Sequence, residues 1–252
     1  IRGPRGTEVA LTLLPKSAKE PKTIKIVRDT ITINSVTTWT KPVKEVENIT
    51  LTNILKNNQN EKVAYVRLSQ FGDNTNQEWF TMANKLNMEL QRDSSIQGVI
   101  LDLRNNPGGY LNDAVFISSE FLPVNTAVVT QDYGGAKKMT LSVERNGLMM
   151  DVPLVVLINR GSASASEIVA GAMRDHNRAI LVGETSFGKG TIQTAEDLGQ
   201  GAGLHVTIAK WLTPDGIRVN EKGLTPDIEV ELNEEQPERD TQLEKAIEEL
   251  VK

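Results

Sequence analysis

The sequence of 252 residues contains no cysteine and only two histidines, His176 and His205. The lack of cysteine excludes thiol catalysis, disulfide bonds and cysteine-ligated zinc, and two isolated histidines do not form a histidine-rich metal site. A chain without cysteine suits an oxidising compartment without establishing one.

An excess of basic charge is also absent, because 28 Lys and Arg residues face 33 Asp and Glu residues, for a net charge of −5. Nucleic acid is therefore not expected as a partner. The sequence has neither a run of about 18 apolar residues nor a signal peptide. Because it opens on Ile1 rather than Met, we expect a piece of a longer protein whose targeting segment or membrane anchor lies upstream.

Residues 1–36 have the short, alternating patterns of β-strands, at 8–14, 22–27 and 31–33. A β segment of this size is too small to bury a core of its own. We therefore expect residues 1–36 to be the end of a small domain that begins upstream. The mostly polar stretch 37–48, which contains Pro42, predicts a linker.

From residue 49 to 232, predicted strands and helices alternate, which is typical of an α/β fold with a mostly parallel sheet. The C-terminal residues 233–252 are expected to form a helix that packs one apolar face on the core. The predicted strands are 63–68, 99–103, 127–130, 154–158 and 179–182, and the predicted helices are 78–90, 111–121 and 165–174.

Ligand and catalytic sites of parallel sheets lie where strands end and turn into helices, and two such turns are unusual here. Asn105–Gly109 places two glycines before a helix, which allows backbone amides to be aimed at an anion. Asn159–Glu167 carries three serines alternating with alanines. A helix cap formed by Ser164 with Glu167 would explain one of these serines but not all three.

The stretch 183–191, GETSFGKGT, resembles a phosphate-binding loop, but Gly190 stands where that loop needs Ser or Thr to bind magnesium. A phosphate-binding loop also opens a helix, whereas the residues after Gly190 alternate as in a strand. We therefore favour another role for Lys189.

A serine at a strand-to-helix turn is well placed as a nucleophile, because the amide that follows it helps to hold an oxyanion. The base is less obvious. His176 follows Asp175 directly, and adjacent helical residues point about 100° apart, so these two do not form a Ser-His-Asp triad easily. A lysine in apolar surroundings is the other known base. Lys189 fits this role, with Phe187 expected to supply an apolar wall.

At this point the sequence resembles the C-terminal processing peptidases, also called tail-specific proteases. Four motifs in the family's order carry the resemblance over most of residues 50–232, and the initial segment resembles the last strands of a PDZ domain. The motifs are NNPGG at 105–109, GSASASE at 161–167, TSFGKG at 185–190 with Gln193, and KGLTPD at 222–227.

The resemblance implies a serine endopeptidase with a fold related to the Clp-protease and crotonase superfamily. It further implies that Ser164 is the nucleophile, Lys189 the general base and Gln193 a residue that positions the lysine. Asp175 matches an aspartate that is implicated in some members of the family.

In the implied reaction, Lys189 takes the Ser164 proton, Ser164 attacks the scissile carbonyl and an acyl-enzyme forms. The backbone amides of Ala165, Gly108 and Gly109 are expected to stabilise the oxyanion. No metal or cofactor is required. The expected partner is a protein or peptide with a free C-terminus, and the expected location is the bacterial periplasm or cell envelope.

Three alternatives remain open from the sequence. An inactive family member would bind peptides or act as a scaffold. A crotonase-type enzyme would use the same glycine amides to bind the thioester of an acyl-CoA. A nucleotide-binding protein would use the loop that contains Lys189 to hold phosphates.

Overall fold

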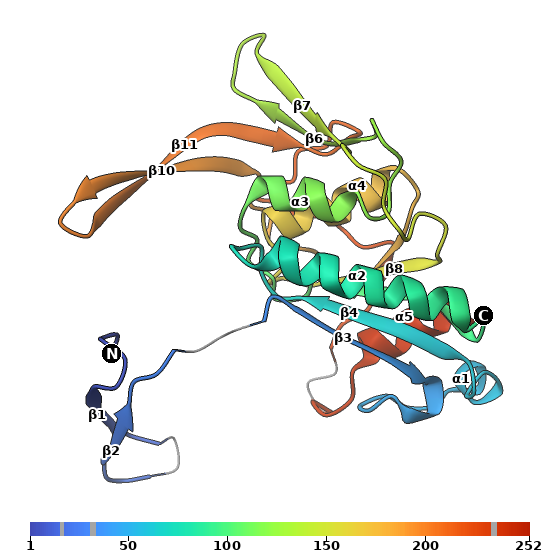
Figure 1. The fold of residues 1–252 in the computed structure, drawn as a ribbon, viewed down its shortest axis with the longest axis horizontal. Coiled ribbons are helices and arrows are strands. Elements are labelled where there is room, and N and C mark those ends of the chain that lie inside the picture. Colours follow the sequence, from blue (N-terminus) through green and yellow to red (C-terminus); the bar gives the residue numbers. More distant parts are fainter. Residues whose placement is uncertain (16–17, 31–33, 233–235) are drawn as a thin grey trace. The chain divides into compact units, whose positions relative to one another are not determined.

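The computed structural model describes residues 1–15, 18–30, 34–232 and 236–252, which fall into two units, 1–33 and 34–252 (Figure 1). The first unit contains the antiparallel pair β1 (Glu8–Leu13) and β2 (Lys22–Val27). These match two of the strands predicted for residues 1–36. The third, at 31–33, lies outside the described residues.

The second unit is built on a six-stranded sheet in the order β12-β9-β8-β5-β4-β3. All neighbouring strands in it are parallel except β3 and β4, so the expected mostly parallel α/β sheet is confirmed. The strands are β3 (Val36–Pro42), β4 (Lys62–Leu68), β5 (Ile96–Asp102), β8 (Leu154–Ile158), β9 (Ile180–Gly183) and β12 (Ile228–Glu229).

The linker predicted at 37–48 is wrong for its first part, which forms the edge strand β3. Mostly polar residues can form this edge strand because they are held by contacts with the neighbouring strand β4. Trp39 stacks on Tyr65 with ring centroids 4.8 Å apart, and Thr38 Oγ1 donates to the Tyr65 carbonyl. Pro42 is tolerated because it ends an edge strand. A short 3-10 helix, Val43–Glu45, follows.

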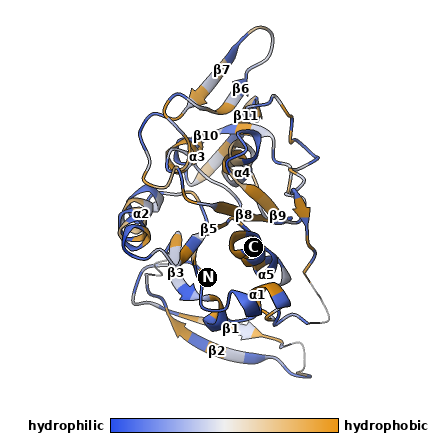
Figure 2. Cartoon of the chain, turned by 90° about the vertical axis from the view of Figure 1, so that its right-hand side faces the viewer, coloured by the Kyte–Doolittle hydropathy of each residue, from blue (hydrophilic) through white to orange (hydrophobic). Residues whose placement is uncertain are grey.

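Both faces of this sheet are covered, as Figure 2 shows by the apolar residues between the layers. One face packs against α2 (Thr75–Arg92), α3 (Leu111–Ser118) and α4 (Ala165–Asp175). The other packs against α1 (Asn53–Asn57) and the C-terminal helix α5 (Thr241–Val251). Alternate residues of β8 serve the two cores: Val156 faces the first and Val155 the second.

A second sheet of four antiparallel strands has the order β10-β11-β6-β7. Its strands are β6 (Ala127–Asp132), β7 (Lys138–Ser142), β10 (Thr191–Gly199) and β11 (Ala202–Leu212). In the described part of the chain, no helix combines the length and the apolar character needed to cross a membrane.

Trp79 on α2 is a fully buried core residue that meets Phe121 edge to face, with ring centroids 6.0 Å apart. We expect Trp79→Ala to lower the free energy of unfolding by about 3–5 kcal/mol, because it leaves a large cavity. The neighbouring Phe80 is 58% exposed, so Phe80→Ala is the matched control, with a change within about 0.5 kcal/mol. Urea denaturation followed by circular dichroism measures both, and equal losses would contradict this assignment of the core.

Candidate active site

The first glycine turn, residues 105–109, follows β5 and is held in place by side-chain amides. Asn106 Nδ2 donates to the carbonyl of Leu68 over 2.8 Å, and Asn106 Oδ1 accepts from Gly108 N over 2.9 Å. Gly109 has φ 146°, and a Cβ there would lie 1.7 Å from the carbonyl oxygen of Phe71. Only glycine fits this position, because the strand-like bridge to Phe71 leaves no room for a side chain.

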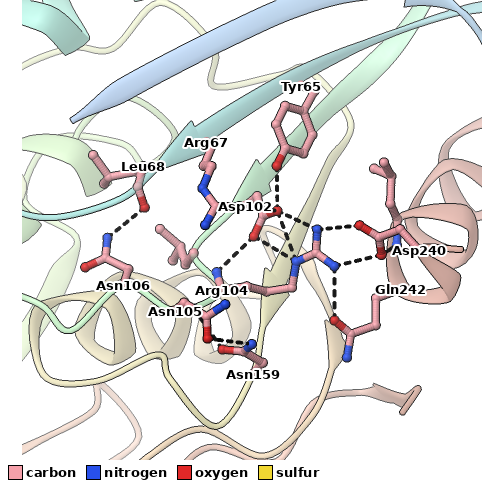
Figure 3. Close-up of polar contacts among 12 residues, drawn as sticks. Tyr65, Arg67, Leu68, Asp102, Arg104, Asn105, Asn106, Asn159, Asp240 and Gln242 are labelled. Carbon is pink, nitrogen blue, oxygen red and sulfur yellow. Dashed lines mark hydrogen bonds and ion pairs between the residues drawn. The ribbon is translucent and has the colours of Figure 1, made fainter. Parts of the chain in front are cut away.

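A buried charge network lies directly before this turn (Figure 3). The guanidinium of Arg104 donates to Asp102, at 2.6 Å, to Asp240 at the N-terminus of α5, at 2.7 Å, and to Gln242, at 3.1 Å. Asp102 is fully buried and also accepts from the hydroxyl of Tyr65 over 2.6 Å. The network therefore fixes the end of β5 to the C-terminal helix.

The pKa values of the network follow from its burial and its charges. Burial disfavours the charged form of Arg104, but the carboxylates of Asp102 and Asp240 outweigh it and raise the pKa of Arg104 above its ordinary value. Burial, together with the charge of Asp102, also raises the pKa of Tyr65. Both residues therefore keep their protons and act as fixed donors.

The serine turn, residues 159–167, explains why three serines are present. Ser162 Oγ donates to the carbonyl of Leu103 over 2.8 Å, and Ser166 Oγ donates to the carbonyl of Asn106 over 2.9 Å. These two buried hydroxyls tie the serine turn to the glycine turn. Asn105 and Asn159 add two hydrogen bonds between the same turns.

Ser164 differs from its two neighbours. It has φ 57° and ψ −116°, a strained conformation for a residue with a side chain. It is half-buried rather than buried, and it directly precedes α4. A Cβ on Gly108 would come within 2.8 Å of the Ser164 Cβ, so the serine lies against the glycine turn. A strained serine at a strand-to-helix turn is the arrangement that presents the nucleophile in α/β-hydrolases.

Glu167 joins Ser164 to the loop that carries Lys189. Its buried carboxylate accepts four hydrogen bonds, two on each oxygen. Oε2 accepts from the amides of Ser164, over 2.7 Å, and Lys189, over 2.9 Å. Oε1 accepts from Ser186 Oγ and from Gly188 N, over 2.5 and 2.7 Å. Because Ser164 N and Lys189 N contact the same oxygen, the two residues lie side by side.

The loop at 183–190 leads into strand β10, not into a helix, which confirms the strand expected after Gly190 and leaves no helix N-terminus for phosphate. Gly188 has φ 87° and packs against the backbone of Val219 and of Lys222 and Gly223, the first two residues of the KGLTPD motif. Lys189 is half-buried. The apolar wall expected from Phe187 is wrong, because that side chain is 64% exposed.

Two further predicted site residues, Gln193 and Asp175, and the histidine weighed as a base, His176, form contacts with other parts of the fold. Gln193 lies on β10, where its Nε2 contacts Thr207 Oγ1 over 3.5 Å. Asp175 ends α4, bonds Arg174 and accepts from the amide of Asp215 over 3.0 Å. His176 Nε2 contacts the carbonyl of Ala127 over 2.7 Å. These contacts tie Asp175 to the turn at Asp215 and His176 to strand β6.

Of the three backbone amides predicted as oxyanion donors, one is already hydrogen-bonded and two are not. The amide of Gly108 donates to Asn106 Oδ1, so it is not available to a substrate. Within the described residues, the amides of Gly109 and Ala165 have no hydrogen-bond partner. Both flank Ser164, because Ala165 follows it directly and the glycine turn packs against it. Also within the described residues, no cluster of three or more metal-binding side chains is found.

Comparison with known proteins places this site in a family. The model of Peptidase family S41 matches residues 62–230, most of the chain. The chain belongs to peptidase family S41. A carboxyl-terminal-processing protease of Picosynechococcus sp. is 39% identical over 227 residues, which cover 90% of this chain and 50% of that protein. A carboxy-terminal-processing protease of Bartonella bacilliformis is 37% identical over 231 residues, 92% of this chain and 49% of that protein.

Among solved structures, the photosystem II D1 C-terminal processing protease matches 99% of this chain and 61% of its own, with a TM-score of 0.66 and 30% identity. The S41 chain thus spans about half the length of the two curated relatives. The resemblance seen in the four motifs is confirmed at the level of the family.

The role of Glu167 was missed from sequence, because a helix cap already explained a glutamate three residues after Ser164. We expect Glu167→Gln to slow the labelling of Ser164 by a fluorophosphonate at least about tenfold, because the amide group turns its NH₂ toward two donors that then lack an acceptor. Glu184→Gln is the matched control in the same loop, since Glu184 has only a 3.9 Å contact with an exposed arginine. Equal rates for both variants would contradict the bridging role.

Arg104 gives a second test of the site's support. Arg104→Met leaves Asp102 as an unpaired buried charge, so we expect a loss of about 3–5 kcal/mol in the free energy of unfolding. The double variant with Asp102→Asn should recover part of this loss. Arg67→Met is the control, because Arg67 lies 4.0 Å from Asp102 and is 39% exposed. Urea denaturation of the unaltered protein and the three variants gives these free energies. A double variant less stable than Arg104→Met would contradict the charge-pair account.

Proposed function

We propose that this S41 chain is the core of a serine endopeptidase that cleaves proteins near their C-terminal tails, with Ser164 as nucleophile and Lys189 as base. One observation carries the proposal: the amides of Ser164 and Lys189 share Oε2 of the buried Glu167. Residues 25 apart in sequence are thereby held in adjacent loops. The names of the relatives, carboxyl-terminal-processing proteases, support the substrate class.

In the proposed mechanism, the neutral amine of Lys189 takes the hydroxyl proton as Ser164 Oγ attacks the scissile carbonyl. The negative charge that develops on the carbonyl oxygen faces the amides of Gly109 and Ala165. The protonated lysine then gives its proton to the leaving amine, and the acyl-enzyme remains on Ser164. Water, activated by the same lysine, releases the acyl group and restores the serine.

We propose supporting roles for Gln193 and Asp175. Gln193 lies four residues after Lys189, and we infer that its amide positions the lysine when substrate occupies the site. Asp175 holds the turn at Asp215 against the end of α4. The same proposal extends to the strands β1 and β2 as the end of a PDZ domain, to a core of the Clp-protease and crotonase type, and to an extracytoplasmic location.

The serine and lysine variants test this proposal. On an unfolded protein with a nonpolar C-terminus, we expect Ser164→Ala and Lys189→Ala each to lower kcat by at least about 10³-fold, as removal of a nucleophile or its base does. His176→Gln should retain activity within about twofold, because in this proposal the base is Lys189 and not a histidine. Mass spectrometry should locate a fluorophosphonate adduct on Ser164 of the unaltered protein.

Each rival predicts a different outcome of these measurements. An inactive family member would bind the unfolded protein but form no adduct on Ser164. A crotonase-type enzyme would bind a thioester, and Ser164→Ala would leave its activity unchanged. If both the serine and the lysine variants still cleave the polypeptide, the dyad assignment fails.

A further inference from the structure

Strand β10 begins two residues after Lys189 and is the outermost strand of the four-stranded sheet. Figure 1 shows the hairpin of β10 and β11 extending away from helices α3 and α4. One side of β10 pairs with β11 along nearly its whole length. Among the described residues no strand pairs with its other side, which is a free edge that starts next to the loop carrying Lys189.

The register fixes which backbone groups face this free edge. Trp211 N donates to the carbonyl of Gly190 over 3.1 Å, so these two residues form a hydrogen-bonded rung of the antiparallel ladder. The next rung, Thr191 with Lys210, is then a rung without ladder bonds. Its Thr191 N–H and C=O point outward from the hairpin.

The same alternation continues along β10. The ladder pairs Ile192 with Ala209 and Gln193 with Thr207, so the extra residue, Ile208, lies on β11. A bulge on β11 leaves the alternation of β10 unchanged. Gln193 and Ala195 therefore present their N–H and C=O groups on the free edge, in line with Thr191.

The first part of this edge, residues 191–195, lacks the features that protect other outer strands, whereas two acidic residues and a bulge follow further along β10. Natural edges are short, or carry lysine or proline that prevents another strand from adding. The outer strand β7 has five residues and begins with Lys138, and the outer strand β3 ends with Lys41 and Pro42. β10 has nine residues and contains neither lysine nor proline.

The paired strand adds an apolar surface. Leu204, Val206 and Ile208 of β11 are 49%, 39% and 44% exposed. Val206 and Leu204 lie opposite Thr194 and Glu196 of β10, so they share a face of the hairpin with them. An extended chain beside β10 would place every second side chain on this face.

We propose that the free edge of β10 binds the substrate polypeptide as an additional β-strand, by hydrogen bonds to the main-chain groups of Thr191, Gln193 and Ala195. This inference rests on the proposed function and names how its substrate is held. Because Lys189 precedes the edge by two residues, a chain bound there leads directly to Ser164. Main-chain recognition accepts many sequences, and the apolar face favours nonpolar segments.

A proline at Ala195 tests the edge. Proline removes the outward N–H and no ladder bond, so the hairpin keeps its pairing. We expect Ala195→Pro to lower kcat/KM for an unfolded polypeptide about tenfold, mainly by raising KM. The reason is that the substrate loses main-chain hydrogen bonds and the proline ring blocks the edge. The rate at which a small fluorophosphonate labels Ser164 should stay within about twofold, because that probe needs no extended chain.

His205→Pro is the matched control. His205 is the rung partner of Ala195, so its N–H faces the opposite edge of the same hairpin. We expect its kcat/KM to stay within about twofold of the unaltered protein, since it also breaks no ladder bond. An equal loss in both variants would show that hairpin stability is being measured, and would overturn the edge proposal.

Hydrogen exchange gives a direct measurement. In the Ser164→Ala protein, adding the unfolded polypeptide should slow exchange at the amides of Thr191, Gln193 and Ala195 but not at His205. Unchanged exchange would overturn the proposal, as would protection that rises with protein concentration without polypeptide, because a second copy would then occupy the edge. Failure of the fluorophosphonate to label Ser164 of the unaltered protein would contradict the proposed function instead.

Discussion

The carboxylate of Glu167 is the interaction on which the arrangement of the site depends. It lies at the first turn of α4, where the helix dipole favours a negative charge, and four donors from two loops satisfy it. A buried carboxylate is costly unless such donors surround it. The donors belong to the serine turn and to the lysine loop, so satisfying the charge brings Ser164 and Lys189 together.

The strained backbone at Ser164 requires support from outside its own turn. Ser162 supplies it by donating to the carbonyl of Leu103, directly after β5, and Ser166 by donating to the carbonyl of Asn106 in the glycine turn. The glycine turn is itself fixed to helix α5 by the Arg104 network, in which Arg104 bonds Asp240, 136 residues away in the sequence. A strained conformation of this kind persists only where its surroundings determine it in this way.

Local features of the site could be predicted from the sequence, and distant ones could not. The glycine turn, the Ser164 turn and the strand after Gly190 depend on neighbouring residues, so their patterns carried the information. The first part of the predicted linker is strand β3, since its polar residues gain their contacts from Tyr65 on the adjacent strand. The pairing of Arg104 with Asp240 left no local pattern, and in Glu167 a capping pattern concealed a bridging role.

In the described part of the chain, the hydrogen bonds that hold Lys189 are made by its peptide units. On one side its amide donates to Glu167, and on the other its carbonyl accepts from Trp211 Nε1 over 2.9 Å. Trp211 is fully buried in the core and belongs to β11. Lys189 and the hairpin therefore share one attachment, so a strand added to β10 would act on the same short segment that presents the lysine. Under the proposal, Gly190 alone separates Lys189 from the edge that holds the substrate, so substrate binding is mechanically linked to the position of the lysine.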